Sequence, residues 1–178
     1  MKVASFDVGI KNLAVCVMTD VYTNVQDWRV ISLIDPEKNV KNTGFQELAD
    51  RIYATLDDYS SKWGYFDHVL IENQPVIKNP KMKTVQMLIY GYFQGERMNG
   101  RIGMIHLLSA RNKLNVDNVI KSTHLKSAYA NAKCSSVMTT REYLKDTGDA
   151  IKLLDNSKKK DDLSDCFLQG VYFFQRCL

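Results

Sequence analysis

Two acidic residues stand at the ends of predicted strands. Asp7 ends the valine-rich segment Val3–Val8, and Glu72 directly follows the apolar segment His68–Ile71. Aspartate is disfavoured in strands, and a buried carboxylate needs a positive partner or a metal ion. Each residue alone also fits a structural role, Asp7 as a cap of the turn at Gly9 and Glu72 as the partner of a lysine. The two residues are therefore candidate ligands whose role depends on what the fold places beside them.

A second acidic group lies near the C-terminus, in the segment KKKDDLSDCFLQG. On a helix, Asp162 and Asp165 occupy positions i and i+3 of one face, whereas Asp161 lies about 100° away from Asp162. Acidic residues also suit the first turn of a helix because its dipole favours negative charge, and we assign Asp161 that role. Like charges at i and i+3 repel unless a cation lies between them. Asp162 and Asp165 are therefore the second pair of candidate ligands.

Four carboxylates can act together only if the fold brings both strand ends to the late helix. Oxygen ligands of this kind suit Mg²⁺ or Mn²⁺ rather than Zn²⁺. Two such ions in one site activate a water molecule and stabilise the leaving oxygen in phosphodiester cleavage. The acidic set Asp7, Glu72, Asp162 and Asp165 therefore predicts a two-metal site holding Mg²⁺, for which Mn²⁺ can substitute.

Charge is distributed unevenly along the chain, although the net charge is only +4. Residues 78–160 carry 16 Lys and Arg against 6 Asp and Glu, and the segments on either side are acidic. A basic block of this size indicates a polyanionic partner, although a solvated lysine-rich face would have the same composition. Arg97, Arg101, Lys126 and Lys133 are further candidates beside the main phosphate-contacting candidates, which are Lys11, Lys78, Lys81, Lys83, Arg111, Lys158, Lys159 and Lys160.

Five short segments, the first two of them rich in valine, are predicted to be strands: Val3–Val8, Leu13–Met18, Trp28–Ile34, His68–Ile71 and Ile102–Leu108. The first two form a hairpin in which Gly9 is free to adopt a positive φ. Apolar residues at helical spacing predict a helix after a capping box at Thr43 and Gln46. A second helix begins at Asn79-Pro80, with Asn as the N-cap, and runs to about Met98. From about Asp117 the chain is predicted to be helical, with breaks near Ser135-Ser136 and Asn156-Ser157.

This order of elements predicts an α/β fold in which helices cover both faces of a five-stranded mixed sheet. We expect residues 1–178 to form a single domain, because the length is about that of one domain. The four cysteines have no C-x-x-C spacing, so we expect reduced thiols and a reducing intracellular compartment. No signal peptide and no run of about 18 apolar residues is present, so we expect no membrane partner.

Four segments also resemble a known family. FDVGIKNLAV, LIENQPVIKNPKMKTVQMLIYGYF, SARNKL and KKDDLSDCFLQ are similar to the signature segments of poxvirus-type Holliday junction resolvases, which are relatives of the mitochondrial and bacterial RuvC-type enzymes. The resemblance implies a ribonuclease-H-like fold, a homodimer, and magnesium-dependent paired nicking of four-way DNA junctions. It places Asp7, Glu72, Asp162 and Asp165 in the catalytic metal site and adds Lys113 as a basic active-site residue. For a poxvirus-type enzyme it also implies the host cytoplasm during infection, or the mitochondrion for the other branch.

Other functions fit parts of the pattern. A broader nuclease for branched DNA, flaps or RNA–DNA hybrids would use the same residues, as would a DNA-binding module of this fold if it lacked activity. An actin-like or sugar-kinase phosphotransferase also carries Asp-x-Gly after its first strand, but it needs two lobes and this chain has the length of one.

The helix Met82–Met98 is apolar nearly all round, which predicts either a dimer interface or a helix packed inside one subunit.

Overall fold

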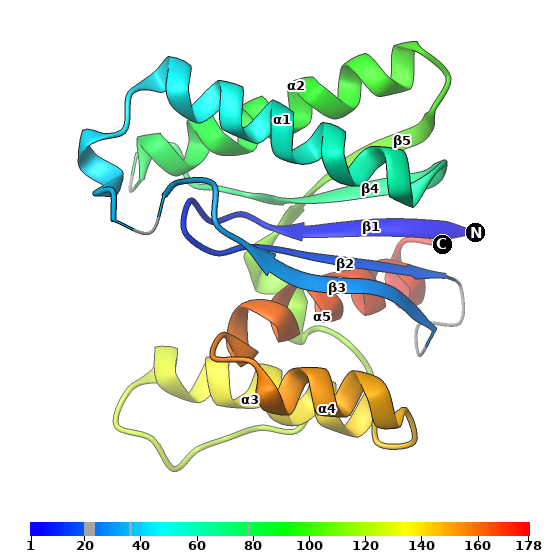
Figure 1. Ribbon diagram of the computed structural model, residues 1–178. Helices are drawn as coiled ribbons and strands as arrows, with labels where there is room; N and C mark the ends of the chain where they lie inside the picture. The colour runs from blue at the N-terminus through cyan, green and yellow to red at the C-terminus, as the bar shows by residue number, and fades with distance from the viewer. Residues whose placement is uncertain (20–23, 36, 78) are drawn as a thin grey trace.

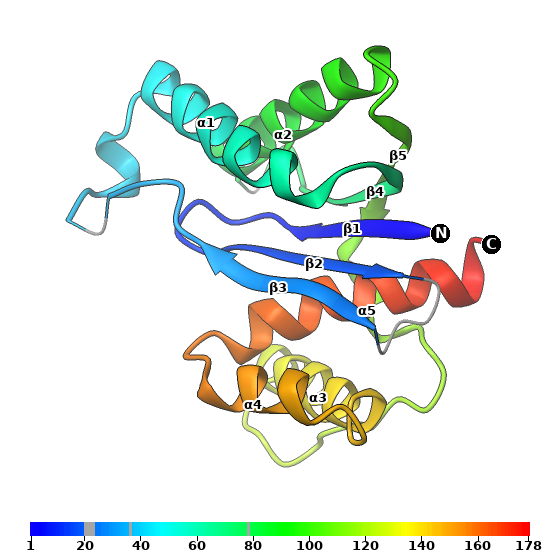
Figure 2. The same ribbon diagram turned by 45° about the vertical axis from the view of Figure 1, so that its right-hand side comes forward.

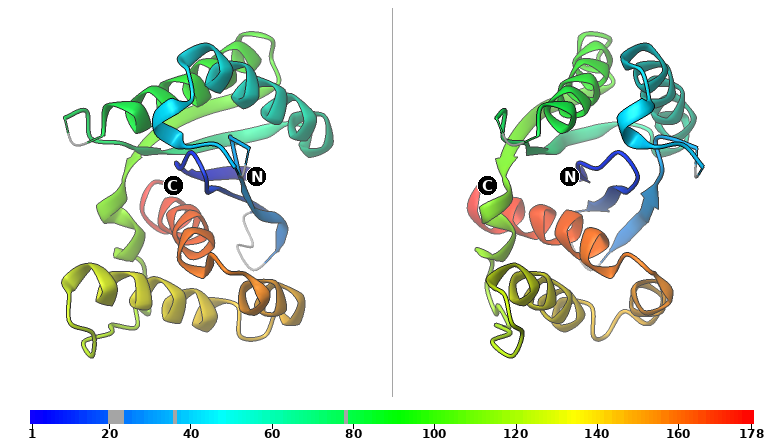
Figure 3. Two further views of the ribbon diagram at one scale, coloured as in Figure 1. Left: turned by 60° about the vertical axis from the view of Figure 1, so that its left-hand side comes forward. Right: turned by 90° about the vertical axis from the view of Figure 1, so that its left-hand side faces the viewer.

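The computed structural model describes residues 1–19, 24–35, 37–77 and 79–178. A central sheet has helices on both of its faces, and further helices lie outside them on one side (Figure 1). Helices α1 (Phe45–Trp63) and α2 (Pro80–Met98) cover one face of the sheet, and α5 (Lys160–Arg176) covers the other. Figures 2 and 3 show α3 (Ala128–Tyr143) and α4 (Gly148–Asn156) on the far side of α5. The predicted α/β fold with helices on both faces of a five-stranded mixed sheet is confirmed.

The sheet has the strand order β3-β2-β1-β4-β5. Strands β1, β2 and β3 form an antiparallel meander, whereas β4 and β5 run parallel to β1. The carboxyl ends of β1, β4 and β5 therefore lie at one edge of the sheet. The five strands span Lys2–Asp7, Leu13–Thr19, Val25–Ile31, Phe66–Asn73 and Ile102–Ser109, in chain order.

The alternation of side chains along the strands directs both strand-end carboxylates to the same face. Val3 of β1 and Leu70 of β4 are buried in the core beneath α5, whereas Phe6 is buried in the core beneath α1 and α2. Side chains two residues apart lie on the same face of a sheet. Asp7 therefore lies on the same α5-facing side as Val3, and Glu72 on the same side as Leu70. The sequence of the strands thus places both acids under the helix that carries Asp162 and Asp165.

Helix α5 is fixed against the sheet by close packing and by polar contacts. A Cβ added to Gly170 would lie 2.6 Å from the Met18 Sδ atom, so a larger residue here would require the buried Met18 side chain to move. The buried Gln169 amide donates to the Ser5 hydroxyl at 3.1 Å and to the Phe6 carbonyl at 3.2 Å. Trp28 Nε1 donates to the Leu163 carbonyl at 2.9 Å. These contacts set the position of α5 relative to β1 and β3.

Several local predictions are wrong. Strand β3 ends at Ile31, and residues 33–34 are buried after it rather than within it. Gly44 is the N-cap of α1 without a side-chain cap, because the Thr43 hydroxyl donates to the Asn39 carbonyl instead. Helix α3 continues through the predicted break, since Ser135 is buried and accepts a hydrogen bond from the Ser122 N–H.

Gly9 is required for a reason other than the predicted one. It does not adopt a positive φ, but a Cβ at this position would lie 2.4 Å from the Asn12 carbonyl oxygen. The turn beside Asp7 therefore depends on close approach of two backbone segments.

Within the described parts of the chain, no helix is both long and apolar enough to span a bilayer. All four cysteines are free thiols, as expected from their spacing.

Candidate active site

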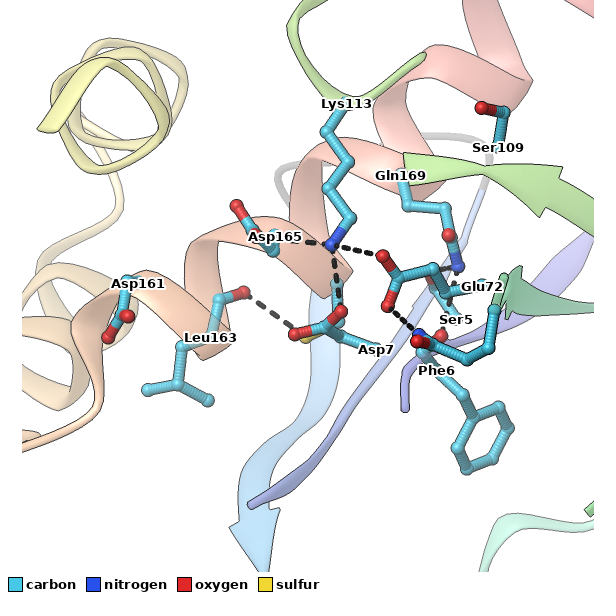
Figure 4. A network of polar contacts seen from close by, with 12 residues as sticks. Ser5, Phe6, Asp7, Glu72, Ser109, Lys113, Asp161, Leu163, Asp165 and Gln169 are labelled. Atoms are coloured by element: carbon cyan, nitrogen blue, oxygen red, sulfur yellow. Dashed lines mark hydrogen bonds and ion pairs between the residues drawn. The ribbon is translucent and has the colours of Figure 1, made fainter. Parts of the chain in front are cut away.

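Three carboxylates from distant parts of the chain converge on one ammonium group (Figure 4). Lys113 Nζ lies 2.7 Å from Asp7 Oδ1, 3.2 Å from Glu72 Oε1 and 3.1 Å from Asp165 Oδ2. The three acids come from β1, β4 and α5, and only the strand order and the placement of α5 bring them together. We call Asp7, Glu72, Asp165 and Lys113 the carboxylate–lysine cluster.

Lys113 is positioned by a short 3-10 helix, Ala110–Leu114, that follows β5 directly. Ser109 caps it, since its hydroxyl accepts from the Arg111 N–H at 3.3 Å. The Lys113 side chain is only 8% exposed. A buried ammonium group requires paired negative charge, and the three carboxylates supply it.

Burial and charge pairing act against each other in the cluster, and burial has the larger effect on the acids. Burial raises the pKa of Asp7 to about 7, and the neighbouring Glu72 adds to this rise although Lys113 opposes it. Burial likewise raises the pKa of Asp165, again against the effect of Lys113. For Lys113, burial alone would lower the pKa, but the charges of the three carboxylates raise it above its ordinary value. Lys113 therefore stays protonated at neutral pH, whereas Asp7 gains and loses its proton around pH 7.

Asp162 lies next to the cluster without joining it. Its Oδ2 is buried and has no hydrogen-bond partner among the described residues, and Lys159 Nζ lies 3.9 Å away from it. Burial raises the pKa of Asp162 to about 6, with further contributions from the charges of Asp161 and Asp7. A buried carboxylate oxygen of this kind is a free ligand for a cation.

Asp161 faces away from the cluster and pairs with Lys133 of α3. Burial would raise the pKa of Asp161, but the bond to Lys133 lowers it below its ordinary value. The helical register thus separates Asp161 from Asp162 as predicted, and it joins α5 to α3 through an ion pair.

The cluster opens into a cavity of about 430 Å³. Asp7, Glu72, Asp162 and Asp165 line it together with Lys113, and its other polar residues are Gln74, Arg111, Tyr129, Lys133 and Ser136. A second cavity, of about 470 Å³, also reaches Asp7 and Asp162 and is lined by Lys11, Lys41 and Lys81. The two cavities therefore meet at the same two carboxylates, with basic residues in each.

The donor set fits divalent cations of the magnesium class. Four carboxylates line one cavity, and one of their buried oxygens, Asp162 Oδ2, accepts no hydrogen bond from the described residues. In the described ranges, no three Asp, Glu, His or Cys side chains already have the arrangement of a metal centre, and the oxygens of Asp7, Glu72 and Asp165 lie around Lys113 Nζ. All the donors are carboxylate oxygens, which Mg²⁺ and Mn²⁺ prefer.

The predicted DNA contacts fall into two groups. Lys11 and Arg111 are exposed and line the two cavities, and Lys158 and Lys159 are exposed just before α5, with Lys160 at its first turn. Lys81 donates to the carbonyls of Val40 and Thr43, and Lys83 to the side chains of Asn73 and Gln86, so both already have protein partners. Lys78 lies outside the described residues.

Several lining residues were not singled out from the sequence. Gln74 donates to Glu72 Oε2 at 2.8 Å, and its place two residues after Glu72 was a usable signal. Lys41 and Tyr129 reach the cavities only because their segments pack beside the strand ends. No spacing in the sequence indicates that packing.

No family model matches the chain. A protein of Acanthamoeba polyphaga mimivirus, described as uncharacterized, is 30% identical over 155 residues, which is 79% of this chain and 37% of that protein. The chain thus spans little more than a third of this relative's length.

Solved structures of Holliday junction resolvases are similar to this chain along nearly its whole length. RuvC of Thermus thermophilus in complex with a Holliday junction covers 98% of this chain and is covered to 95%, with a TM-score of 0.63 and 14% identity. For the yeast mitochondrial resolvase, the similarity covers 97% of this chain and 77% of the yeast chain, with a TM-score of 0.64 and 18% identity. For the fowlpox virus resolvase in complex with junction DNA, the similarity covers 100% of this chain and 99% of the viral chain, with a TM-score of 0.60 and 17% identity. The chain therefore has the ribonuclease-H-like fold of the RuvC-type and poxvirus-type Holliday junction resolvases.

Proposed function

We propose that this chain is a metal-dependent endonuclease that resolves four-way DNA junctions by paired, symmetric nicks. Residues 1–178 are its single nuclease domain, it acts as a homodimer, and it works in a reducing intracellular compartment such as the host cytoplasm during viral infection. The observation that carries the proposal is the convergence of Asp7, Glu72 and Asp165 in a cavity that Asp162 also lines.

Asp7, Glu72, Asp162 and Asp165 would hold two Mg²⁺ ions, with Mn²⁺ as a substitute. When bound, these ions supply an activated water and charge stabilisation for the leaving oxygen. Gln74 holds Glu72 in orientation by donating to its Oε2. Lys113 brings a fixed positive charge to the same point, where it balances the carboxylates and opposes the charge of a scissile phosphate.

The paired cavities supply a path for the substrate strand. Because both reach Asp7 and Asp162, a strand with its phosphate at the carboxylates extends into one cavity on each side. The second cavity offers the exposed Lys11 and Lys41, and the first offers Arg111. Phosphate contacts from such residues position a nucleic acid without reading its sequence.

Junction geometry distinguishes this proposal from a general nuclease. The solved neighbours of this fold include two resolvases bound to Holliday junctions, but the same carboxylates would also cut other branched substrates. Two matched nicks require two sites related by a two-fold axis, and one such domain supplies a single site.

The test is a cleavage assay on a synthetic four-way junction, a flap, an RNA–DNA hybrid and a linear duplex, each with Mg²⁺ and with a chelator. We expect Mg²⁺-dependent, symmetric nicks near the branch point of the junction and little cutting of linear duplex. Equal cutting of flap, hybrid and junction would favour the broader nuclease, and binding without cutting would favour a non-catalytic module.

A further inference from the structure

The cavity above the carboxylates has an exposed aromatic residue on its α3 wall. Tyr129 is the second residue of α3, is 71% exposed, and lines the same cavity as Asp7 and Asp165. An aromatic side chain this exposed contributes little to the packing of α3. Its exposed place on the cavity wall therefore favours a role in ligand binding over a role in packing.

The Tyr129 ring is held in position by its neighbour one helical turn along. Lys133 Nζ lies 5.0 Å from the ring centroid, which is a cation–π arrangement, and Lys133 is itself held by Asp161 of α5. The bond to Asp161 raises the pKa of Lys133, so its charge is permanent at neutral pH. The ion pair between Asp161 and Lys133 and the cation–π contact between Lys133 and Tyr129 thus orient the exposed ring beside the active site. Little further entropy is then lost when a ligand binds to the ring.

We infer that Tyr129 is a stacking platform for a nucleobase next to the scissile phosphate. The inference rests on the proposed function, because it takes a DNA strand with its phosphate at the carboxylates. Bases have an aromatic face, and exposed aromatic residues beside basic ones are the usual means of holding unpaired bases. Lys133 and Arg111 line the same cavity and are suited to the phosphates of the same strand.

The role differs from that of the catalytic carboxylates. Tyr129 fixes which nucleotide lies at the cut, so it is a positioning and specificity residue. Stacking accepts every base with different strength, so the platform would bias cleavage toward certain sequences without requiring one. Asp161 supports the ring through Lys133, and its substitution should have a smaller effect of the same kind.

The experiment uses four-way junctions carrying 2-aminopurine at single positions on either side of the cut, bound in Ca²⁺ to slow cleavage. We compare the wild-type chain with Tyr129→Ala, Tyr129→Phe and Tyr65→Ala. Tyr65 is a matched control because it is 53% exposed and lines a different cavity, with residues of α1 and α2. Cleavage rates and cut-site distributions in Mg²⁺ are measured on unlabelled junctions.

We expect quenching of 2-aminopurine at one flanking position for wild type, Tyr129→Phe and Tyr65→Ala, and its loss in Tyr129→Ala. Cleavage by Tyr129→Ala should be slower by roughly fivefold to a hundredfold and spread over more positions, as the loss of one stacked base implies. Equal quenching in Tyr129→Ala and wild type would overturn the platform. Loss in Tyr129→Phe as large as in Tyr129→Ala would also overturn it, since the hydroxyl would then be the contact. A wild-type chain that does not bind junctions at all would instead contradict the proposed function, and the platform with it.

Discussion

The residues of the carboxylate–lysine cluster and the neighbouring Asp162 are governed by the competition between burial and charge pairing. Asp7 and Asp162 have raised pKa values, of about 7 and about 6, because burial disfavours their charged forms. Lys113 remains charged because three carboxylates surround it. These acids should therefore gain protons as the pH falls below 7, and a cation should bind them more tightly as the pH rises.

Asp7 makes the stability of the metal-free protein depend on pH. Its folded pKa exceeds the ordinary value of 3.8, so the folded state binds more protons than the unfolded state between about pH 4 and pH 7. Its contribution to stability is complete below about pH 4 and is lost as the pH rises through 7. We expect the melting temperature of wild type relative to Asp7→Asn, measured with a chelator, to fall between pH 5 and pH 8. A difference that is constant or rises with pH would show that Asp7 is not buried in this way.

Lys113 should matter more for turnover and stability than for binding. In the metal-free protein, Lys113→Ala leaves three buried carboxylates without their cation, which should cost about 3–5 kcal/mol, and Mg²⁺ should restore part of the loss. Junction affinity and its salt dependence should stay nearly normal, while single-turnover cleavage becomes much slower. Weaker binding, a smaller salt slope and normal turnover would instead make Lys113 an ordinary phosphate contact.

At the scale of elements, the strand ends and the start of α2 could be predicted, whereas the continuous course of α3 could not. The end of β1 at Asp7 and the N-cap at Asn79, whose side chain accepts from the Met82 N–H at 3.2 Å, are local features and are confirmed. The continuous helix α3 could not be predicted, because Ser135 has a tertiary partner, the Ser122 N–H, that no local pattern shows. For the same reason Tyr129 was missed, whereas the acids could be selected by their unfavourable positions in strands and by their helical spacing.

The register of α5 predicts different effects for two neighbouring residues. Asp162 lines both cavities, whereas Asp161 pairs with Lys133 outside the cluster. Asp162→Asn should therefore lower the cleavage rate severely, and Asp161→Asn should lower it only mildly. Circular dichroism and junction affinity serve as controls for folding. Equal losses of cleavage in both variants would show that the register is wrong.

At the scale of the whole molecule, the outer surface of α2 and the β5 edge are candidates for the dimer interface. Met87 and Met98 of α2 and Met104 of β5 are exposed, although Val85 and Phe93 of α2 are buried in the core. The helix is therefore partly packed inside one subunit and partly available to another. Exposed apolar residues in such a group usually mark a contact.

Sedimentation at micromolar concentration should show a species of twice the 20.4 kDa chain, with junction DNA or without it. Met87→Asp should shift it to monomer and abolish paired nicking while single nicks persist. A monomer in all conditions would contradict the dimer, whereas a Met87→Asp variant that stays dimeric would contradict only the location.

On the proposed function, the four carboxylates Asp7, Glu72, Asp162 and Asp165 form the cutting site of a junction nuclease. The most direct measurement compares wild type and Asp7→Asn for Mg²⁺-dependent cleavage of a four-way junction and for affinity toward the same junction. Asp7 contacts Lys113 at 2.7 Å, so its substitution removes a proposed cation ligand without removing a basic residue that could contact a phosphate. We predict that Asp7→Asn binds the junction as wild type does and does not cut it. Cleavage at the wild-type rate by the folded variant would show that the four carboxylates are not the cutting site.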